Sequence, residues 1–167
     1  DTLSLHDALP IFDGDYNNNT ANNMCCSCSV CARCVLLGSF EAGDEQDSVE
    51  RLIICNELSQ VQLNHLYRVL LTSMANPSLG QAEVAKTVFR SLRNRANLVD
   101  ELFGVNASDT RVFSQAIFDS GISDHKNLRL ILQNLRYLPT RNSFHKEWPL
   151  WKNQLKSELA QDIKMVF

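Results

Sequence analysis

The sequence predicts an all-α fold for residues 48–167, and three observations lead to that prediction. Apolar residues recur at spacings of three and four along several segments, which is the period of one face of an α-helix. Residue types that cap helices stand before these segments, and Gly or Pro stands after several of them. No segment alternates apolar and polar residues with period two, so we predict no strands.

The chain divides by charge near Ser48. Residues 1–47 hold eight acidic and one basic side chain, whereas residues 48–167 hold eleven acidic and fifteen basic ones. We therefore predict a disordered or artefactual leader at 1–47, acidic and rich in cysteine, and one helical domain at 48–167. No apolar run approaches the roughly 20 residues that a membrane span needs. We expect a cytoplasmic protein.

Two segments of the leader support this division. The opening Asp1–Ile11, which reads DTLSLHDALPI, resembles a translated sequencing adapter, and we expect it to be artefact. The polar tract Asn17–Asn23 cannot supply a core, so we predict disorder there.

A cysteine cluster follows, with Cys25, Cys28, Cys31 and Cys34 each three positions apart. Three interpretations stay open. The thiolates could hold zinc or an iron–sulfur cluster, because soft sulfur ligands suit both. Alternatively, S-palmitoylation beside the apolar residues 35–37 could tether the chain to a membrane surface. The third interpretation gives the cluster no role.

The helical domain begins with a short apolar turn over residues 51–55. Ser59 is a good N-cap for the helix that follows, whose apolar face carries Leu63, Leu66, Tyr67 and Leu70. Residues 76–77, Asn-Pro, end this helix.

Two more helices are predicted before Gly104. Ser78 is the expected cap of a helix that runs through Leu92, and a shorter helix spans Leu98–Phe103. Gly104 can adopt the left-handed conformation that ends it.

The last third of the domain carries three further helical patterns. Ser108 or Asp109 caps a helix with an apolar face at residues 112, 113, 116 and 117. A second pattern runs over His125–Leu138, and Pro149 suits the first position of the last helix.

The residues from 56 to 138 resemble the globin family, particularly its divergent invertebrate members. Leu58–Gln62 is similar to the opening of the family's first helix, and Gly80–Leu92 to its second helix. Asn97–Gly104 resembles the turn that carries the haem-stacking phenylalanine, which would be Phe103. His125 follows Phe103 by 22 positions, about the separation of the family's distal histidine.

This resemblance implies a haem cofactor and a small gaseous ligand such as O2. Phe103 would stack on the porphyrin, while His125, Leu128 and Leu132 would form the distal face. The family's proximal histidine would fall near Gln154, in a helix without histidine. His145 is the later histidine that could ligate iron. The expected globin-like fold is therefore incomplete by one or two helices.

The sequence supports two functions of different classes. The first is a haem-binding, globin-like protein that binds oxygen or senses gases or redox state. The alternative is a haem-free helical module for protein interaction, since a missing helix would expose an apolar patch. We expect no enzymatic activity and no nucleic-acid binding, because no catalytic or recognition motif is present. A homo-oligomer is compatible with either function.

Overall fold

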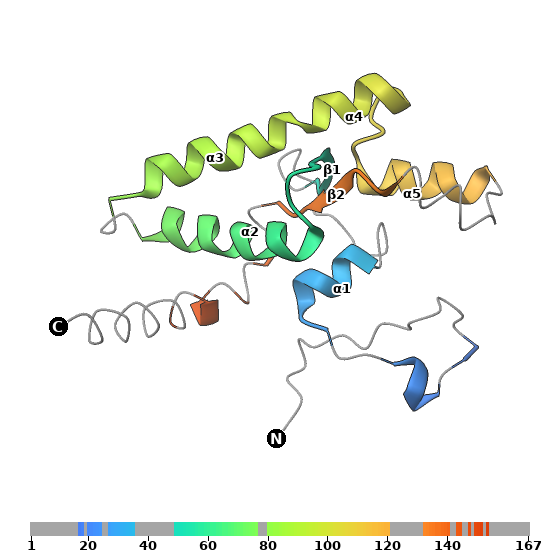
Figure 1. The fold of residues 1–167 in the computed structure, drawn as a ribbon, viewed down its shortest axis with the longest axis horizontal. Coiled ribbons are helices and arrows are strands. Elements are labelled where there is room, and N and C mark those ends of the chain that lie inside the picture. Colours follow the sequence, from blue (N-terminus) through green and yellow to red (C-terminus); the bar gives the residue numbers. More distant parts are fainter. Residues whose placement is uncertain are drawn as a thin grey trace.

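The computed structural model describes residues 17–18, 20–24, 27–35, 49–76, 80–120, 132–140, 143–144, 147, 149–151 and 153. These residues are mostly helical, with one small sheet near the middle of the molecule (Figure 1). In chain order the elements are η1 (Ala21–Asn23), α1 (Ser29–Val35), β1 (Arg51–Ile54), α2 (Gln60–Ala75), α3 (Ala82–Asn94), α4 (Ala96–Phe103), α5 (Thr110–Asp119) and β2 (Leu135–Leu138).

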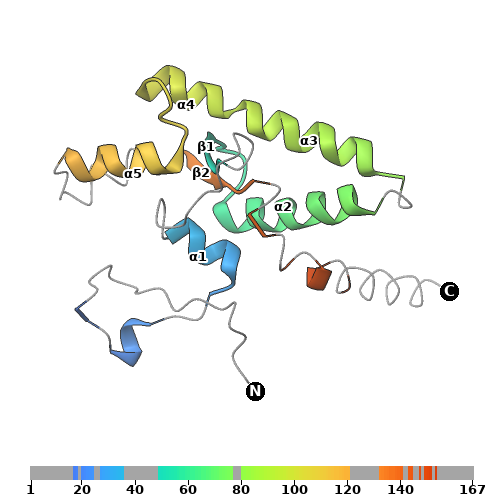
Figure 2. The ribbon, with the colours of Figure 1, turned by 180° about the vertical axis from the view of Figure 1, so that it is seen from behind.

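The sheet joins two segments that are far apart in the sequence. Strands β1 and β2 pair antiparallel, with Arg51 opposite Leu138 and Ile54 opposite Leu135. Asp109 adds an isolated bridge to Arg51 on the same strand. Helices α3 and α4 lie on one side of the sheet and α1 on the other, and both views show this arrangement (Figures 1 and 2).

The side chain of Gln60 covers part of the outer edge of β2. Its Nε2 donates to the carbonyl oxygen of Tyr137 at 2.9 Å, and its Oε1 accepts from the amide of Tyr137 at 2.8 Å. A strand edge with unpaired groups invites pairing with another chain. At this position the side-chain amide makes the two hydrogen bonds that a further strand would make.

Helix α2 is the centre of the fold, and its predicted start is confirmed. The hydroxyl of Ser59 accepts from the amide of Gln62, and the side chain of Gln62 accepts from the amide of Ser59. This capping box satisfies two amides that have no partner within the helix. Asn76 ends the helix as expected.

The predictions for α3, α4 and α5 are largely confirmed. Helix α3 begins at Ala82, later than expected, and the predicted cap at Ser78 lies outside the described residues. Helix α4 ends at Gly104, whose φ is 112°. Asp109 caps α5, and its carboxylate accepts from the amide of Arg111.

The apolar residues form two clusters. The first lies around α2 and contains Tyr67, which is fully buried and contacts the rings of Phe89 and Phe144 with centroids 6.3 and 6.0 Å apart. The second lies between the sheet, α4 and α5, and includes Leu52, Val99, Ala107, Phe113, Leu135 and Tyr137.

The prediction of a fold without strands is wrong at two places. Residues 51–54 form β1 rather than a turn, and residues 135–138 form β2 rather than the end of a helix. Both strands have four residues, and neither shows a clear alternation of buried and exposed positions: the two inner residues of β1 are buried, and all residues of β2 except Arg136 are buried. A short apolar run of this kind does not distinguish a strand from a helix. The rest of the predicted helix, up to residue 131, lies outside the described residues.

The predicted leader contributes one helix to the packed body. Val30 and Ala32 of α1 are each 1% exposed, and Val30 belongs to the first cluster. The boundary predicted at Ser48 lies outside the described residues and stays a prediction, as does the disorder of the leader as a whole. Within the described part of the chain, no helix has both the length and the apolar character needed to cross a membrane.

Candidate functional site

The corner between α4 and α5 holds an apolar surface on a turn fixed by hydrogen bonds. The carboxylate of Asp100 accepts from the amide of Ser108 at 2.7 Å and from its hydroxyl at 3.1 Å. Arg51 Nη1 donates to the same hydroxyl at 2.9 Å. Because Ser108 is fully buried, these contacts fasten the turn to both α4 and β1.

The backbone of the turn is closed by two further hydrogen bonds. The amide of Ala107 donates to Gly104, and that of Asp109 donates to Asn106, both at 3.0 Å. Asn106 has a φ of 62°, a conformation that Asn adopts more readily than most residues. The result is an ordered turn that leaves Val105 88% exposed.

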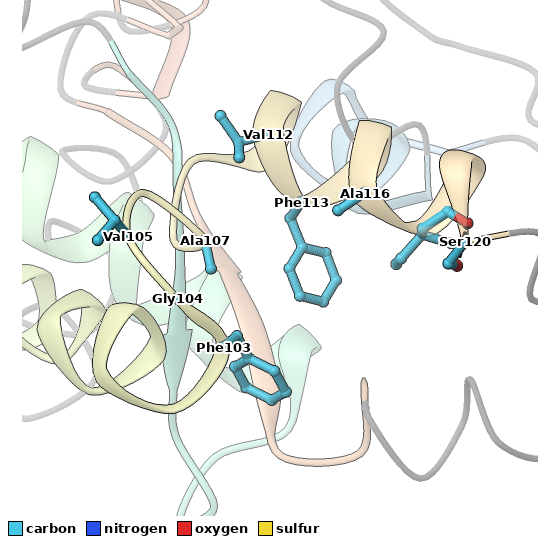
Figure 3. A pocket seen from close by; sticks show the side chains of 9 residues that line it. Phe103, Gly104, Val105, Ala107, Val112, Phe113, Ala116 and Ser120 are labelled. Carbon is cyan, nitrogen blue, oxygen red and sulfur yellow. Dashed lines mark hydrogen bonds between the residues drawn. The ribbon is translucent and has the colours of Figure 1, made fainter.

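An apolar pocket of about 260 Å³ opens beside this turn (Figure 3). The rings of Phe103 and Phe113 lie next to each other, edge to face, with centroids 6.0 Å apart. Ser120 is the one lining residue with a polar side chain; the complete lining is Phe103, Gly104, Val105, Ala107, Val112, Phe113, Ala116, Ile117 and Ser120. Pockets for small molecules typically have volumes of about 300–1,000 Å³, so this one suits apolar side chains of a partner better.

Several large apolar side chains of α4, of α5 and of the turn between them are exposed, and three of them, Phe103, Val105 and Val112, line the pocket. Phe103 is 45% exposed, and the others are Leu98, Leu102, Val105, Val112 and Phe118. Scattered single residues of this kind are ordinary, whereas a concentration on one corner indicates an interaction surface. We call the pocket and these side chains the α4–α5 corner.

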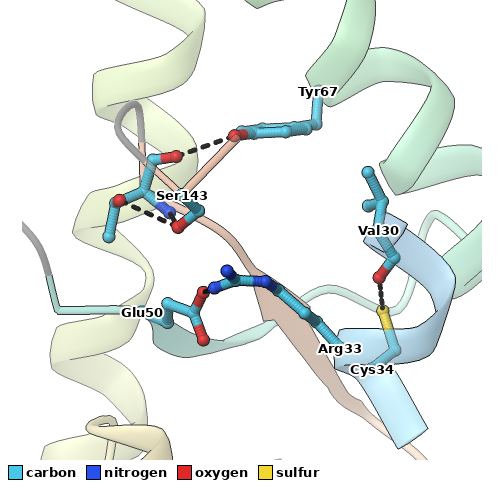
Figure 4. A network of polar contacts seen from close by, with 7 residues as sticks. Val30, Arg33, Cys34, Glu50, Tyr67 and Ser143 are labelled. Carbon is cyan, nitrogen blue, oxygen red and sulfur yellow. Dashed lines mark hydrogen bonds and ion pairs between the residues drawn. The ribbon is translucent and has the colours of Figure 1, made fainter. Parts of the chain in front are cut away.

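A second group of contacts links α1 and α2 to the segments next to the sheet (Figure 4). Arg33 forms an ion pair with Glu50, which is 8% exposed, and its guanidinium lies 4.9 Å from the ring centre of Phe144. Tyr67 donates to the carbonyl oxygen of Thr140 at 2.7 Å. Burial raises the pKa of Tyr67 far above its usual value, so this hydroxyl stays protonated and acts as a donor.

The thiols of α1 lie beside Asn64 of α2. The side-chain amide of Asn64 donates to the sulfur of Cys31 at 3.4 Å and to that of Cys34 at 3.6 Å. Burial raises the pKa of Cys34 to about 12, so it is a neutral thiol near pH 7. Cys28 is exposed, and Cys25 lies outside the described residues.

No group of three or more His, Cys, Asp or Glu side chains could hold a metal ion in the part of the chain that the structure describes. Since Cys25 is not in that part, the metal and palmitoylation interpretations of the cluster stay predictions.

The structure places two of the predicted site residues. Phe103 ends α4 and lines the pocket, and Leu132 is half-buried against the second cluster. His125, Leu128 and His145 lie outside the described residues, so their predicted proximity to Phe103 is not tested.

Sequence reasoning missed the surface as a site. The sequence predicts one apolar helical face that carries Val112, Phe113, Ala116 and Ile117, without assigning it to a binding site. In the structure Phe113 is buried, while Val112 and Ala116 are exposed at the pocket. The apolar run Leu102–Val105, which surrounds a helix-ending glycine, was the available signal.

Comparison with known proteins shows the family to which the chain belongs. No protein-family model matches the chain. The chain is 33% identical over 156 residues to the Type 4 apparatus protein DotN of Legionella pneumophila, and the match spans 93% of this chain and 72% of DotN. The chain belongs to the DotN family. Because so little lies outside the match, the cysteine cluster is within it.

This relationship overturns the globin resemblance. The match to DotN spans nearly the whole chain, whereas the globin-like features were short patterns spread over about half of it. Capped amphipathic helices are common to many folds, so a phenylalanine and a histidine at a suitable separation do not define a globin. The predicted haem, iron and oxygen-binding function is therefore wrong.

Proposed function

We propose that this chain is an interaction subunit of a multiprotein assembly of the Type 4 apparatus kind, and that the α4–α5 corner binds a partner protein. The relationship to DotN carries the proposal, because DotN is named as a protein of such an apparatus. The alternative drawn from the sequence, a haem-free helical interaction module, agrees with it.

The geometry of the corner supports partner binding in two ways. The turn is held by Asp100 and Ser108, so the partner would meet a surface that is already ordered. Ordering a surface before binding reduces the entropy lost in the complex. The pocket beside Phe103 and Phe113 has room for a large apolar side chain, the kind that dominates interface energies.

The proposed role is non-catalytic. It requires the burial of apolar side chains against a partner, with about 25 cal/mol gained for each Å² of apolar surface removed from water. The polar groups beneath the turn hold the corner in shape, since Asp100 and Arg51 each form a hydrogen bond with Ser108.

Site-specific photo-crosslinking tests this proposal. The full chain is produced in Legionella pneumophila with a photoreactive amino acid in place of Phe103, and adducts are identified by mass spectrometry. The matched control carries the same group in place of Val69 on α2, because both side chains are 45% exposed. We expect adducts with a Type 4 apparatus protein from position 103 and far fewer from position 69.

Two results would contradict the proposal. If neither position yields an adduct with an apparatus protein, the chain is not a subunit of that assembly in these cells. If position 69 yields as much adduct as position 103, the chain is a subunit but the α4–α5 corner is not its binding surface.

A further inference from the structure

The outer face of α5 is self-complementary. This property goes beyond the proposed binding of a partner protein, although the face shares Val112 and Phe118 with the α4–α5 corner. Five exposed side chains cover one face of the helix, with Gln115 at its centre and the others three or four positions from it: Arg111, Val112, Gln115, Phe118 and Asp119. Phe118 is 81% exposed, and it is not among the residues that line the pocket. The face carries a cation at one end, an anion at the other and apolar side chains between them.

A helix that complements this face needs an acid opposite Arg111, a base opposite Asp119 and apolar residues opposite Val112 and Phe118. A second α5 turned end for end meets each requirement. With Gln115 on the two-fold axis, Asp119 of the second copy lies opposite Arg111, and its Phe118 lies opposite Val112. Every contact then occurs twice, as in an isologous two-fold interface.

The charged side chains at the two ends of this face can form these contacts in addition to the ones they already make. The guanidinium of Arg111 uses Nε and Nη2 for Asp109, at 3.2 and 3.0 Å, and is 49% exposed, so Nη1 can donate further. One carboxylate oxygen of Asp119 accepts from Gln115 at 2.8 Å, and the second oxygen can accept from the other copy.

We infer that two copies of this chain associate through antiparallel pairing of their α5 helices. Helix α5 has ten residues, so the buried area falls in the class of weak, transient interfaces, below about 1,200 Å² in total. The association is reversible and depends on concentration, and it weakens with salt because its ends are ion pairs at the surface.

A charge swap tests the pairing on the full chain. Sedimentation velocity, from about 10 μM to about 1 mM, measures the dimer dissociation constant of each variant. Arg111→Asp and Asp119→Arg each place like charges opposite one another at both ends of the pair, and each should weaken association by at least about tenfold. The double variant restores opposite charges and should return to within about threefold of the original constant.

Two further variants address the apolar contact and the fold. Phe118→Ser should abolish association, whereas Val69→Ser on α2 should leave it unchanged. Circular dichroism confirms folding; if a charge variant unfolds, the comparison of Phe118→Ser with Val69→Ser decides. The inference is overturned if the chain stays monomeric throughout, if the folded double variant does not recover, or if Val69→Ser weakens association as much as Phe118→Ser.

The outcome is separable from the proposed function. A dimer that dissociates in Arg111→Asp, while photo-crosslinking from position 103 persists, shows that partner binding does not depend on the pairing of α5 helices. A chain that crosslinks from position 103 but never self-associates retains the proposed function and loses this inference.

Discussion

The cluster around α2 and the α4–α5 corner contain similar residues but expose them very differently. Tyr67 of the first cluster is fully buried and contacts two aromatic rings, whereas Phe103 at the corner contacts Phe113 and leaves 45% of its surface open. Both residues lie on apolar helical patterns in the sequence. The first region therefore stabilises the chain, and the second has apolar surface left to bury against another protein.

The largest expected effect on stability comes from a substitution in the cluster around α2. Tyr67→Ala removes a buried ring and its hydrogen bond to Thr140, and we expect the free energy of unfolding to fall by about 3–5 kcal/mol. Urea denaturation measures this change. Tyr67→Phe keeps the ring and should cost only about 1 kcal/mol. A loss below about 1 kcal/mol for Tyr67→Ala would show that this cluster is not the core.

The second prediction tests what holds the corner in shape. Asp100→Ala removes both hydrogen bonds to the buried Ser108, and we expect a loss of about 1–3 kcal/mol. Hydrogen exchange at the amide of Ser108 should also become faster. Glu101→Ala is the matched control, because this neighbouring acid is exposed. Equal effects for both variants would argue against the role of Asp100 in the turn.

The third prediction concerns a local contribution within the first region. Ser59→Ala removes one half of the capping box, so the free energy of unfolding should fall by about 1 kcal/mol. Ser91→Ala on the exposed face of α3 is the control, and it should be neutral or slightly stabilising because Ala favours helix. Thermal unfolding of both variants measures the difference. Similar losses would mean that the box contributes little.

The parts of the fold that could be predicted are those held by interactions between residues close together in the sequence. Ser59 and Asp109 mark helix starts because a cap bonds to residues two or three positions away, and both were predicted. Strands β1 and β2 were missed because their paired residues are between 81 and 87 positions apart, and neither strand is stabilised without the other. The pattern of apolar residues within a run of four does not distinguish a strand from a helix, and the sequence does not show which distant run is its partner.

The candidate site was less predictable than the fold for a related reason. Phe103 was singled out, but for contact with haem rather than as the wall of an apolar pocket. The exposure of Val112 beside the buried Phe113 depends on how α5 crosses the end of α4. That arrangement is fixed by Asp100, Ser108 and Arg51, whose contacts link residues up to 57 positions apart.

The smallest expected effect on stability comes from an exposed valine in the turn after α4, and it is compared with the effect of a buried valine within α4. Val105→Ser changes a side chain that is 88% exposed, so the free energy of unfolding should stay within about 0.5 kcal/mol. The same substitution at Val99, which is fully buried in the second cluster, should cost about 2 kcal/mol or more, because it removes buried methyl groups and buries a hydroxyl. Urea denaturation measures both changes.

The same two substitutions should affect partner binding in the opposite order to their effect on stability. If the corner is a partner surface, Val105→Ser lowers the yield of crosslinking from position 103 although the protein is as stable as before. Val99→Ser, in the fraction that stays folded, preserves the exposed side chains and should keep the yield. Because Val105 contributes little to the stability of the fold, its substitution should affect only the binding of the partner. Unchanged yield in Val105→Ser would place the partner elsewhere, because the most exposed apolar side chain of the corner would then contact nothing.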